Sequence, residues 1–214
     1  VYGLESPGFW STGVKPVFKI TTRRGYELRL TGNHKLSKLV KRTKDGQETA
    51  WTAVDDLAVG DEIVLGNHRG VAPWAGTGGF AEGWLLGALI GDGTFSGDDR
   101  EAVAATATEM LEHLFRPDTS LWVSRSENKI RLASADLWHL AARYGITRGN
   151  KTVTDALERG SYDLYRGLLC GLFDADGSVQ GDQTNGLSVR LAQSDADLLR
   201  RVQRMLARLG IVST

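Results

Sequence analysis

The stretch "GLLCGLFDADGS", residues 167–178, is an apolar run that contains regularly spaced small residues and is followed by Asp-Gly. The stretch "GWLLGALIGDGT", residues 83–94, has the same arrangement. The small residues recur at every fourth position: Gly83, Gly87 and Gly91 in one stretch, and Gly167, Gly171 and Ala175 in the other. Residues four apart lie on one face of a helix. A glycine inside a helix costs roughly 0.5–1 kcal/mol relative to alanine, and close approach of two helices is a reason to carry several. The sequence therefore predicts two helices that pack face to face through these residues.

Each of these runs ends in an aspartate, Asp92 or Asp176, one position after the last small residue. Parallel packing of the two helices would bring both carboxylates together at their C-terminal ends. That end of a helix dipole is negative and disfavours an anion, so a carboxylate pair there favours a hard divalent cation such as Mg²⁺. A single Asp-Gly is ordinary turn chemistry, whereas two copies with matching small-residue faces indicate a site.

The region 83–214 reads as an internal repeat, with one copy at about 83–158 and another at about 161–214. In each copy a short strand region and an amphipathic helix follow the Asp-Gly run. The expected helices are "EMLEHLF" and "ADLWHLAARYG" in the first copy and "ADLLRRVQRMLARLG" in the second; the expected strands include "LWVSRS", "NKIRLAS" and "LSVRLAQS". The second copy stops after its first such helix, so we expect it to be incomplete.

The segments "LLGALIGDG" and "LLCGLFDADG" resemble the two motifs of the LAGLIDADG homing endonucleases. The second is nearly exact from Gly171 to Gly177, whereas the first has Ile90 where the family has aspartate. The resemblance implies a single-chain pair of αββαββα repeats whose sheets saddle a double-stranded DNA target, with both strands cut. It also implies that Asp92 and Asp176 bind the metal ions, Mg²⁺ or another divalent cation, and activate water for attack on the phosphates.

A lysine at the end of the first copy is a third candidate for this site. Lys151 lies in "GITRGNKTV", which is similar to an "NK-x-x-P" block in the nuclease domains of inteins, where a lysine lies near the cleavage site. Thr154 stands where that block usually has proline. Two interpretations stay open here: a catalytic lysine and a solvated loop lysine.

The first third of the chain reads as short β-strands, expected at 17–22, 26–31, 48–54 and 61–66. The segment 15–44 holds ten lysines and arginines against one acid, Glu27. Such a segment predicts either a face that attracts phosphates or an ordinary solvated surface.

Within this third, Thr31 and His34 form a T-x-x-H unit that follows an expected strand. Together with "TGVKPVFKITTRRGYELRL" and "TAVDDLAVGDEIV", it resembles the Hint (hedgehog/intein) splicing domain. The resemblance implies that Thr31 and His34 bind the peptide at the upstream splice junction, where His34 would protonate the leaving nitrogen. A Hint domain before a LAGLIDADG endonuclease is the layout of a large intein.

We therefore expect an α+β multidomain chain: a partial, β-rich Hint domain at 1–70, a glycine-rich linker at 71–82, and LAGLIDADG αββαββα pseudo-repeats at 83–214, the second truncated. The chain begins with Val1 rather than a nucleophile and ends in "GIVST" rather than His-Asn, and Cys170 is expected inside the packed helix. We expect no splicing from this chain alone, and its nuclease activity is itself in question because the second copy is incomplete. "TGVKPVFKI" resembles inteins of ribonucleotide reductases, which would make such a host precursor protein the splicing partner.

Two other classes of function are alternatives. A LAGLIDADG-fold module that binds DNA or RNA without cleavage, as a regulator or maturase, would need neither Asp92 nor Asp176. A metabolic enzyme would need another catalytic cluster, and the sequence shows neither a nucleotide-binding glycine loop nor Cys/His metal spacing. The 214 residues are 41% hydrophobic and 24% charged with zero net charge and one cysteine, which is typical of an intracellular globular protein. No signal peptide or run of about 20 apolar residues is present, and we expect a monomer.

Overall fold

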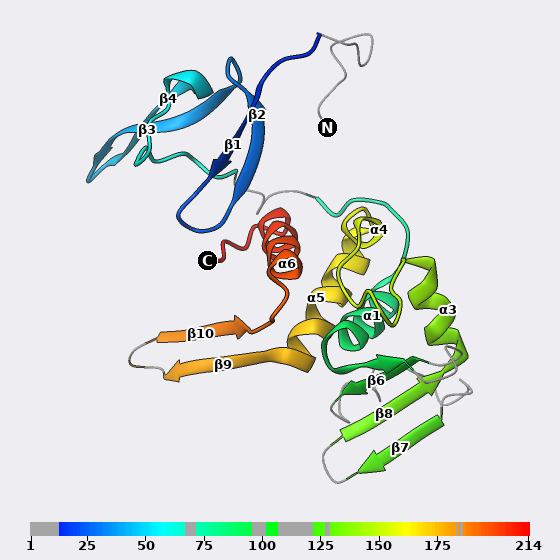
Figure 1. The fold of residues 1–214 in the computed structure, drawn as a ribbon. Coiled ribbons are helices and arrows are strands. Elements are labelled where there is room, and N and C mark those ends of the chain that lie inside the picture. The colour runs from blue at the N-terminus through cyan, green and yellow to red at the C-terminus, as the bar shows by residue number, and fades with distance from the viewer. Residues whose placement is uncertain are drawn as a thin grey trace. The chain divides into compact units, whose positions relative to one another are not determined.

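The computed structural model describes residues 13–66, 72–95, 102–106, 122–126, 129–182, 184 and 186–214. The chain divides into two compact units, Val1–Asn67 and His68–Ser213, and Figure 1 traces both. Within the described ranges, every helix is too short or insufficiently apolar to cross a membrane.

The first unit is built from two β-hairpins. Its elements are β1 Val17–Thr21, β2 Glu27–Thr31, β3 Lys35–Thr43, β4 Gly46–Ala53 and a 3₁₀ turn, η1 Val54–Asp56. Strand β1 pairs antiparallel with β2 and β3 pairs antiparallel with β4. Gly25, with φ at +87°, closes the β1–β2 turn in the left-handed region that favours glycine.

Two details of this unit differ from the sequence-based expectation. Strand β3 was not predicted, because its lysines and leucines do not alternate regularly. The segment expected as a strand at 61–66 forms only a bridge, in which Ile63 opposes Lys38 and the Leu39 N–H donates to the Glu62 carbonyl at 2.8 Å. The pairing of β3 with β4 is irregular between Leu39 and Lys41.

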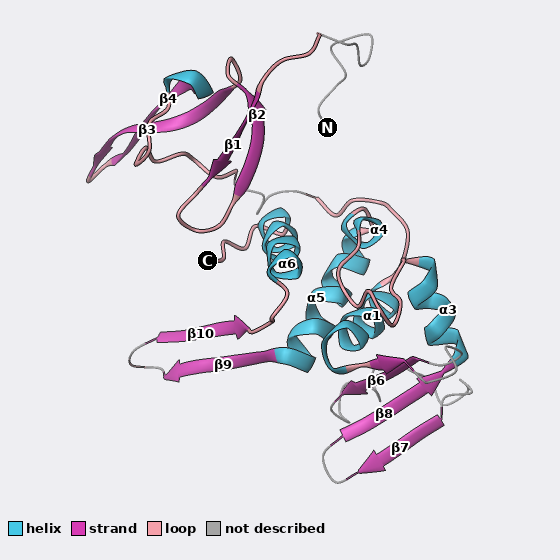
Figure 2. Ribbon diagram, viewed as in Figure 1, coloured by secondary structure: helices cyan, strands magenta, loops and turns pink. Residues whose placement is uncertain are grey.

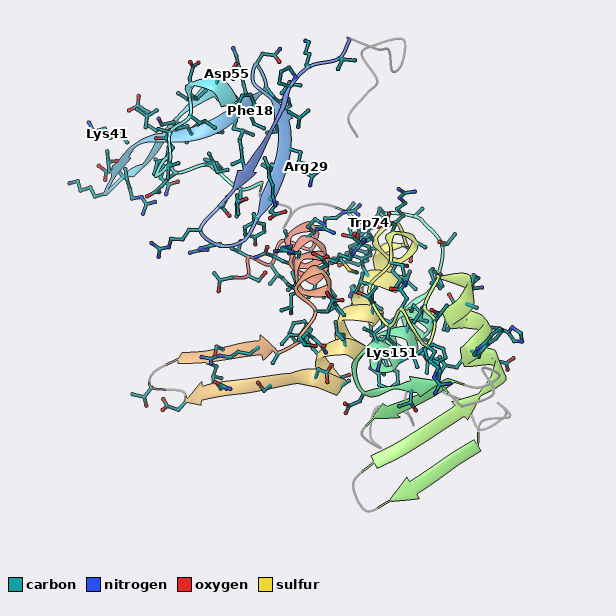
Figure 3. The ribbon with its side chains drawn as sticks, in the orientation of Figure 1. Phe18, Arg29, Lys41, Asp55, Trp74 and Lys151 are labelled. Atoms are coloured by element: carbon teal, nitrogen blue, oxygen red, sulfur yellow. The ribbon has the colours of Figure 1, made fainter. Side chains whose placement is uncertain are left out.

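Most side chains of the first unit face solvent. Among its described apolar residues only Val54 is buried. Phe18 and Trp51 are exposed, and Figure 3 shows Phe18 and the basic Arg29 and Lys41 on this unit. The basic segment is partly neutralised by ion pairs from Lys19 to Glu27, Lys38 to Asp61 and Arg42 to Glu62, at 2.7, 2.7 and 2.8 Å.

The second unit carries the α-helices, as Figure 2 shows; the helical ribbon beside β4 in the first unit is η1. Its elements are α1 Phe80–Asp92, β5 Thr94–Phe95, β6 Ala102–Thr106, β7 Trp122–Ser126, β8 Lys129–Ser134, α3 Ala135–Arg143, α4 Asp155–Glu158, α5 Tyr162–Asp176, β9 Gly177–Asp182, β10 Gly186–Leu191 and α6 Ala196–Arg208. Strands of the first copy form an antiparallel sheet in the order β5-β6-β8-β7, and β9 pairs with β10 in a hairpin. The helix expected at "EMLEHLF" lies outside the described residues.

Element order repeats between the two halves of this unit. The run α1–β5–β6 is matched by α5–β9–β10, and in each copy the strand begins directly after the Asp-Gly end of the helix. The mixed α/β composition agrees with the expected class of fold.

The core of the second unit lies around α1 and α5, with α3 and α6 packed on it. Its buried side chains include Trp84, Leu86 and Leu89 of α1, Leu164, Leu168 and Leu172 of α5, Leu137 and Ala141 of α3, and Leu198, Val202 and Met205 of α6. Burial of this apolar surface supplies most of the driving force for the fold.

The segment that precedes α1 is packed rather than extended free of the unit. Trp74 meets the rings of Tyr162 and Tyr165 edge-on, with centroids 5.2 and 5.1 Å apart, and its indole N–H donates to the Gly160 carbonyl at 2.9 Å. Helix α1 begins at Phe80, inside the stretch 71–82 that the sequence suggests as a linker. Ring packing on α5 therefore ties the approach to α1 into the second unit.

Candidate active site

Glycines on α1 lie directly against the backbone of α5. A Cβ placed on Gly83 would lie 2.2 Å from the Leu164 carbonyl oxygen, and one on Gly87 would lie 2.2 Å from the Leu168 carbonyl oxygen. Non-bonded atoms do not approach this closely, so no larger residue fits at either position without moving the helices apart. The spacing also shows that the two helices are parallel. Four residues further along α1, from Gly83 to Gly87, the contact moves four residues forward along α5, from Leu164 to Leu168.

The same contact is made from the other side. A Cβ on Gly167 would lie 2.0 Å from the Phe80 carbonyl oxygen, and one on Gly171 would lie 2.0 Å from that of Trp84. Phe80 and Trp84 hold the places in α1 that Leu164 and Leu168 hold in α5. The two helices therefore meet about a local pseudo-twofold axis, as expected from a repeat.

The contact continues to the C-terminal ends of both helices. A Cβ on Gly91 would lie 2.6 Å from the Ala175 Cβ and 3.0 Å from Oδ2 of Asp176. Asp92 and Asp176 are the last residues of α1 and α5. The glycine that follows each of them donates its backbone N–H to a carbonyl of the last turn: Gly93 to Leu89, and Gly177 to Phe173. Both carboxylates thus project from the same end of the helix pair.

The surroundings of Asp176 disfavour its ionised form. Burial raises the pKa of the Asp176 carboxyl above its ordinary value, and the nearby negative charge of Asp92 raises it further. Lys151 and a hydrogen bond from Gln193 act in the opposite direction. Asp92 itself is exposed and Asp176 is half-buried. The two carboxylates are close enough to repel each other, which is the condition that a shared cation relieves.

Lys151, labelled in Figure 3, reaches the C-terminal end of α1. Its ammonium donates to the Gly91 carbonyl at 3.2 Å and to the Gly93 carbonyl at 2.5 Å. Burial lowers the pKa of Lys151, and the charges of Asp176 and Asp92 oppose that decrease. The structure therefore brings Asp92, Asp176 and Lys151 together, and the ammonium is held by the carbonyls of Gly91, in the last turn of α1, and of Gly93, just after it.

Gln193, which no sequence motif singled out, also reaches this site. It follows β10 in "LAQSDAD", and its side-chain amide Nε2 donates a hydrogen bond to Oδ2 of Asp176. Nothing in the local pattern marks Gln193, because its role depends on the path that the chain takes after β10.

The two motif copies differ two residues before their helices end. Asp174, the first aspartate of "DADG", accepts a hydrogen bond from the buried Trp84 indole N–H at 2.9 Å, whereas its counterpart Ile90 is buried in the core. Cys170 is exposed, although the sequence suggested a place inside the packed helix. Gly171 faces α1, and the preceding residue lies about 100° around the helix, which turns Cys170 toward solvent.

Thr31 and His34 lie in the first unit, at the turn between β2 and β3. The Thr31 hydroxyl donates to the side-chain carbonyl of Asn33 at 2.9 Å, and the His34 N–H donates to the Thr31 carbonyl at 3.0 Å. The His34 carbonyl in turn accepts from the Val54 N–H at 2.9 Å. The turn is thus well ordered by backbone bonds, and the His34 side chain is exposed.

The donor set of the Asp92–Asp176 site suits a hard cation. In the ranges that the structure describes, no group of three or more His, Cys, Asp and Glu residues could hold a metal ion. Mg²⁺ is commonly held by only one or two carboxylates, with waters and substrate phosphates completing its shell. Two carboxylates at one end of a helix pair fit that mode and do not fit a closed structural zinc site.

Comparison with known proteins finds a family match for one copy of the repeat. Residues 163–214 match the LAGLIDADG-like domain, and this range contains most of α5, the β9–β10 hairpin and α6. The solved structure of mesophilic variants of the homing endonuclease I-DmoI aligns with 63% of this chain and 74% of its own, at 17% identity and a TM-score of 0.42.

Two curated relatives align with almost the whole chain. Ribonucleoside-diphosphate reductase NrdEB subunit alpha of Bacillus subtilis (strain 168) is 23% identical over 223 residues, which cover 92% of this chain and 20% of the reductase. Replicative DNA helicase DnaB of Rhodothermus marinus is 30% identical over 231 residues, which cover 94% of this chain and 23% of the helicase. The chain thus spans about a fifth to a quarter of the length of these relatives.

Proposed function

We propose that this chain is part of an intein whose second unit is a divalent-metal-dependent LAGLIDADG DNA endonuclease. The observation that carries the proposal is the meeting of Asp92, Asp176 and Lys151 at one end of the α1–α5 contact. The family match of residues 163–214 supports the same assignment.

The relatives support the intein part of the proposal. A reductase and a helicase carry out unrelated chemistry. Each nevertheless aligns with nearly the full length of this chain, and the aligned region is only a minor part of the reductase or the helicase. A segment shared by hosts of unrelated function is typical of an inserted element. Under this proposal the first unit belongs to a splicing domain, in which Thr31 and His34 would bind the upstream junction.

In the nuclease unit Asp92 and Asp176 would hold Mg²⁺ and present it to the DNA phosphates. A cation held there would supply Lewis-acid chemistry, by polarising the phosphate and lowering the pKa of a coordinated water. Lys151 would supply a fixed positive charge beside the phosphate, where negative charge increases in the transition state. Its hydrogen bonds to Gly91 and Gly93 hold it in that place without neutralising it, since both acceptors are carbonyls.

The β9–β10 hairpin would carry DNA contacts away from this site. It begins directly after Asp176, and one of its faces presents Ser178, Gln180, Ser188 and Arg190. On that face Arg190 donates to the Ser188 hydroxyl at 3.2 Å. A two-stranded ribbon fits the major groove of DNA, where arginine and glutamine side chains read base edges.

The test is cleavage of a pool of supercoiled plasmids with randomised inserts, with Mg²⁺ or Mn²⁺, and sequencing of the ends produced. We expect metal-dependent cleavage by the wild-type chain and a loss of at least 100-fold in Asp92→Asn and in Asp176→Asn. Asp163→Asn, an exposed carboxylate on α5 that pairs with Arg166 at 3.8 Å, serves as the matched control and should cleave normally. Retention of wild-type rates by both site variants would remove the nuclease assignment, and retention of DNA binding without cleavage would favour the regulator or maturase class.

A further inference from the structure

The loop between β10 and α6, residues 192–195, contacts the candidate site at two points. Gln193 donates to Oδ2 of Asp176, and Asp195 accepts a hydrogen bond from the Thr152 hydroxyl at 3.3 Å. Thr152 directly follows Lys151 in the chain. One short loop therefore contacts both an aspartate of the second copy and the segment that carries the lysine of the first.

This loop is held in place by the helix that follows it. Oδ1 of Asp195 caps α6 by accepting from the N–H groups of Asp197 and Leu198 at 2.9 and 3.1 Å. Leu198, like Met205 further along α6, is buried in the core. A cap and a buried helix face restrict the loop's motion, so the position of Gln193 is set by the packing of α6.

The oxygen that Gln193 holds is the one that faces the other helix. Oδ2 of Asp176 lies 3.0 Å from the point where a Cβ on Gly91 would be, so it is directed toward the end of α1. Rotation of a carboxylate about its last torsion is broad and weakly restrained. A hydrogen bond to one oxygen limits that rotation, and because each carboxylate oxygen has two lone pairs, the held oxygen keeps one for another partner.

We propose that Gln193 is a positioning residue that orients the Asp176 carboxylate toward Asp92 for binding of the divalent cation. This inference rests on the proposed function, because it assumes that the two aspartates hold a metal. The Gln193 amide carries no charge and does not ionise, so it can order the carboxylate without competing as a cation. Partners that orient metal-binding groups typically contribute 10–100-fold to metal affinity.

The experiment measures Mn²⁺ binding to the full chain without DNA, by titration calorimetry. Gln193→Met keeps nearly the same length and volume and removes the donor, and we expect its dissociation constant for Mn²⁺ to rise 10–100-fold. Gln203→Met is the matched control: this amide lies on α6 and donates to the Ser213 carbonyl at 3.5 Å. It should bind Mn²⁺ as the wild type does, and melting temperatures of all three proteins should agree within a few degrees.

A second readout separates orientation from a purely structural effect. In DNA cleavage by Gln193→Met, the Mn²⁺ concentration at half-maximal rate should rise by the same factor, whereas KM for DNA at saturating Mn²⁺ should be unchanged. Equal Mn²⁺ affinity in Gln193→Met and wild type would overturn the inference. Tighter binding in the variant would overturn it too, because Gln193 would then be competing with the cation for Asp176.

The two proposals fail in different ways. If Mn²⁺ binding to the wild-type chain is absent, or is unaffected by Asp176→Asn, the metal site fails and the role of Gln193 fails with it. If binding depends on Asp176 and is unaffected by Gln193→Met, only the positioning role is refuted.

Discussion

Replacement of Gly171 by alanine should force α1 and α5 apart and destabilise the second unit. The new Cβ would lie 2.0 Å from the Trp84 carbonyl oxygen, whereas real Cβ contacts essentially never fall below 3.0 Å. The helices must therefore separate locally by about 1 Å, and a gap of that size forfeits a quarter to a half of each dispersion contact across it. Overpacking of this kind costs about 1–3 kcal/mol, and alanine recovers only roughly 0.5–1 kcal/mol through helix propensity.

Hydrogen exchange of peptides from α1 and α5 measures this effect within the second unit alone, which a global melt of a two-unit chain does not. A net loss of about 1 kcal/mol corresponds to roughly fivefold faster exchange through unfolding, at about 1.4 kcal/mol per tenfold. The control is Gly149→Ala, where a Cβ would meet nothing within 4 Å and exchange should not change.

A double variant tests whether one separation accounts for the cost. Gly87→Ala introduces its Cβ 2.2 Å from the Leu168 carbonyl oxygen, across the same interface. Because one movement of the helices relieves both contacts, the double variant with Gly171→Ala should cost less than the sum of the two single variants. Exchange in Gly171→Ala as slow as in the wild type would show that the helices do not meet through their glycines, and strict additivity would refute the shared movement.

Three further predictions concern the site and its support. Asp176→Asn should raise the melting temperature at pH 7. Burial and Asp92 raise the folded-state pKa of Asp176, so its ionised form lowers stability, and that cost disappears as pH falls through the folded-state pKa. Melting curves from pH 7 to pH 3 should therefore converge for variant and wild type, and a constant difference would contradict the assigned cause. Lys151→Met should reduce the rate of DNA cleavage at least 100-fold and leave Mn²⁺ affinity within a few-fold of wild type; normal cleavage would indicate a solvated loop lysine. Ser161→Ala removes the cap that accepts the Leu164 N–H at 3.0 Å and should cost about 1 kcal/mol in a denaturation experiment without changing Mn²⁺ affinity.

The sequence was most informative where structure follows from helix period. Small residues four apart must share a face, and the six predicted positions from Gly83 to Ala175 do lie at the contact between α1 and α5. The same period places the aspartate that follows each set at the same end of the pair. The parallel direction needed the repeat as well, because a single glycine-lined helix does not specify its partner.

Pattern reasoning failed where neighbours in space are distant in sequence. Cys170 was assigned to the packed helix because the run around it is apolar, yet one residue is enough to turn a side chain from the α1 contact to solvent. Strand β3 was missed because its lysines interrupt the expected alternation, and pairing with β4 sets its conformation instead.

The sequence alone determined the helix pair and its two acidic ends, because i to i+4 spacing and Asp-Gly termination are local properties of the chain. Only the tertiary structure decided what surrounds those ends. Lys151 reaches the Gly91 and Gly93 carbonyls, and Gln193 reaches Asp176, because the packing of α6 and the path of the loops bring separate segments together. Such contacts depend on the burial of whole helix faces, and no short stretch of sequence specifies them.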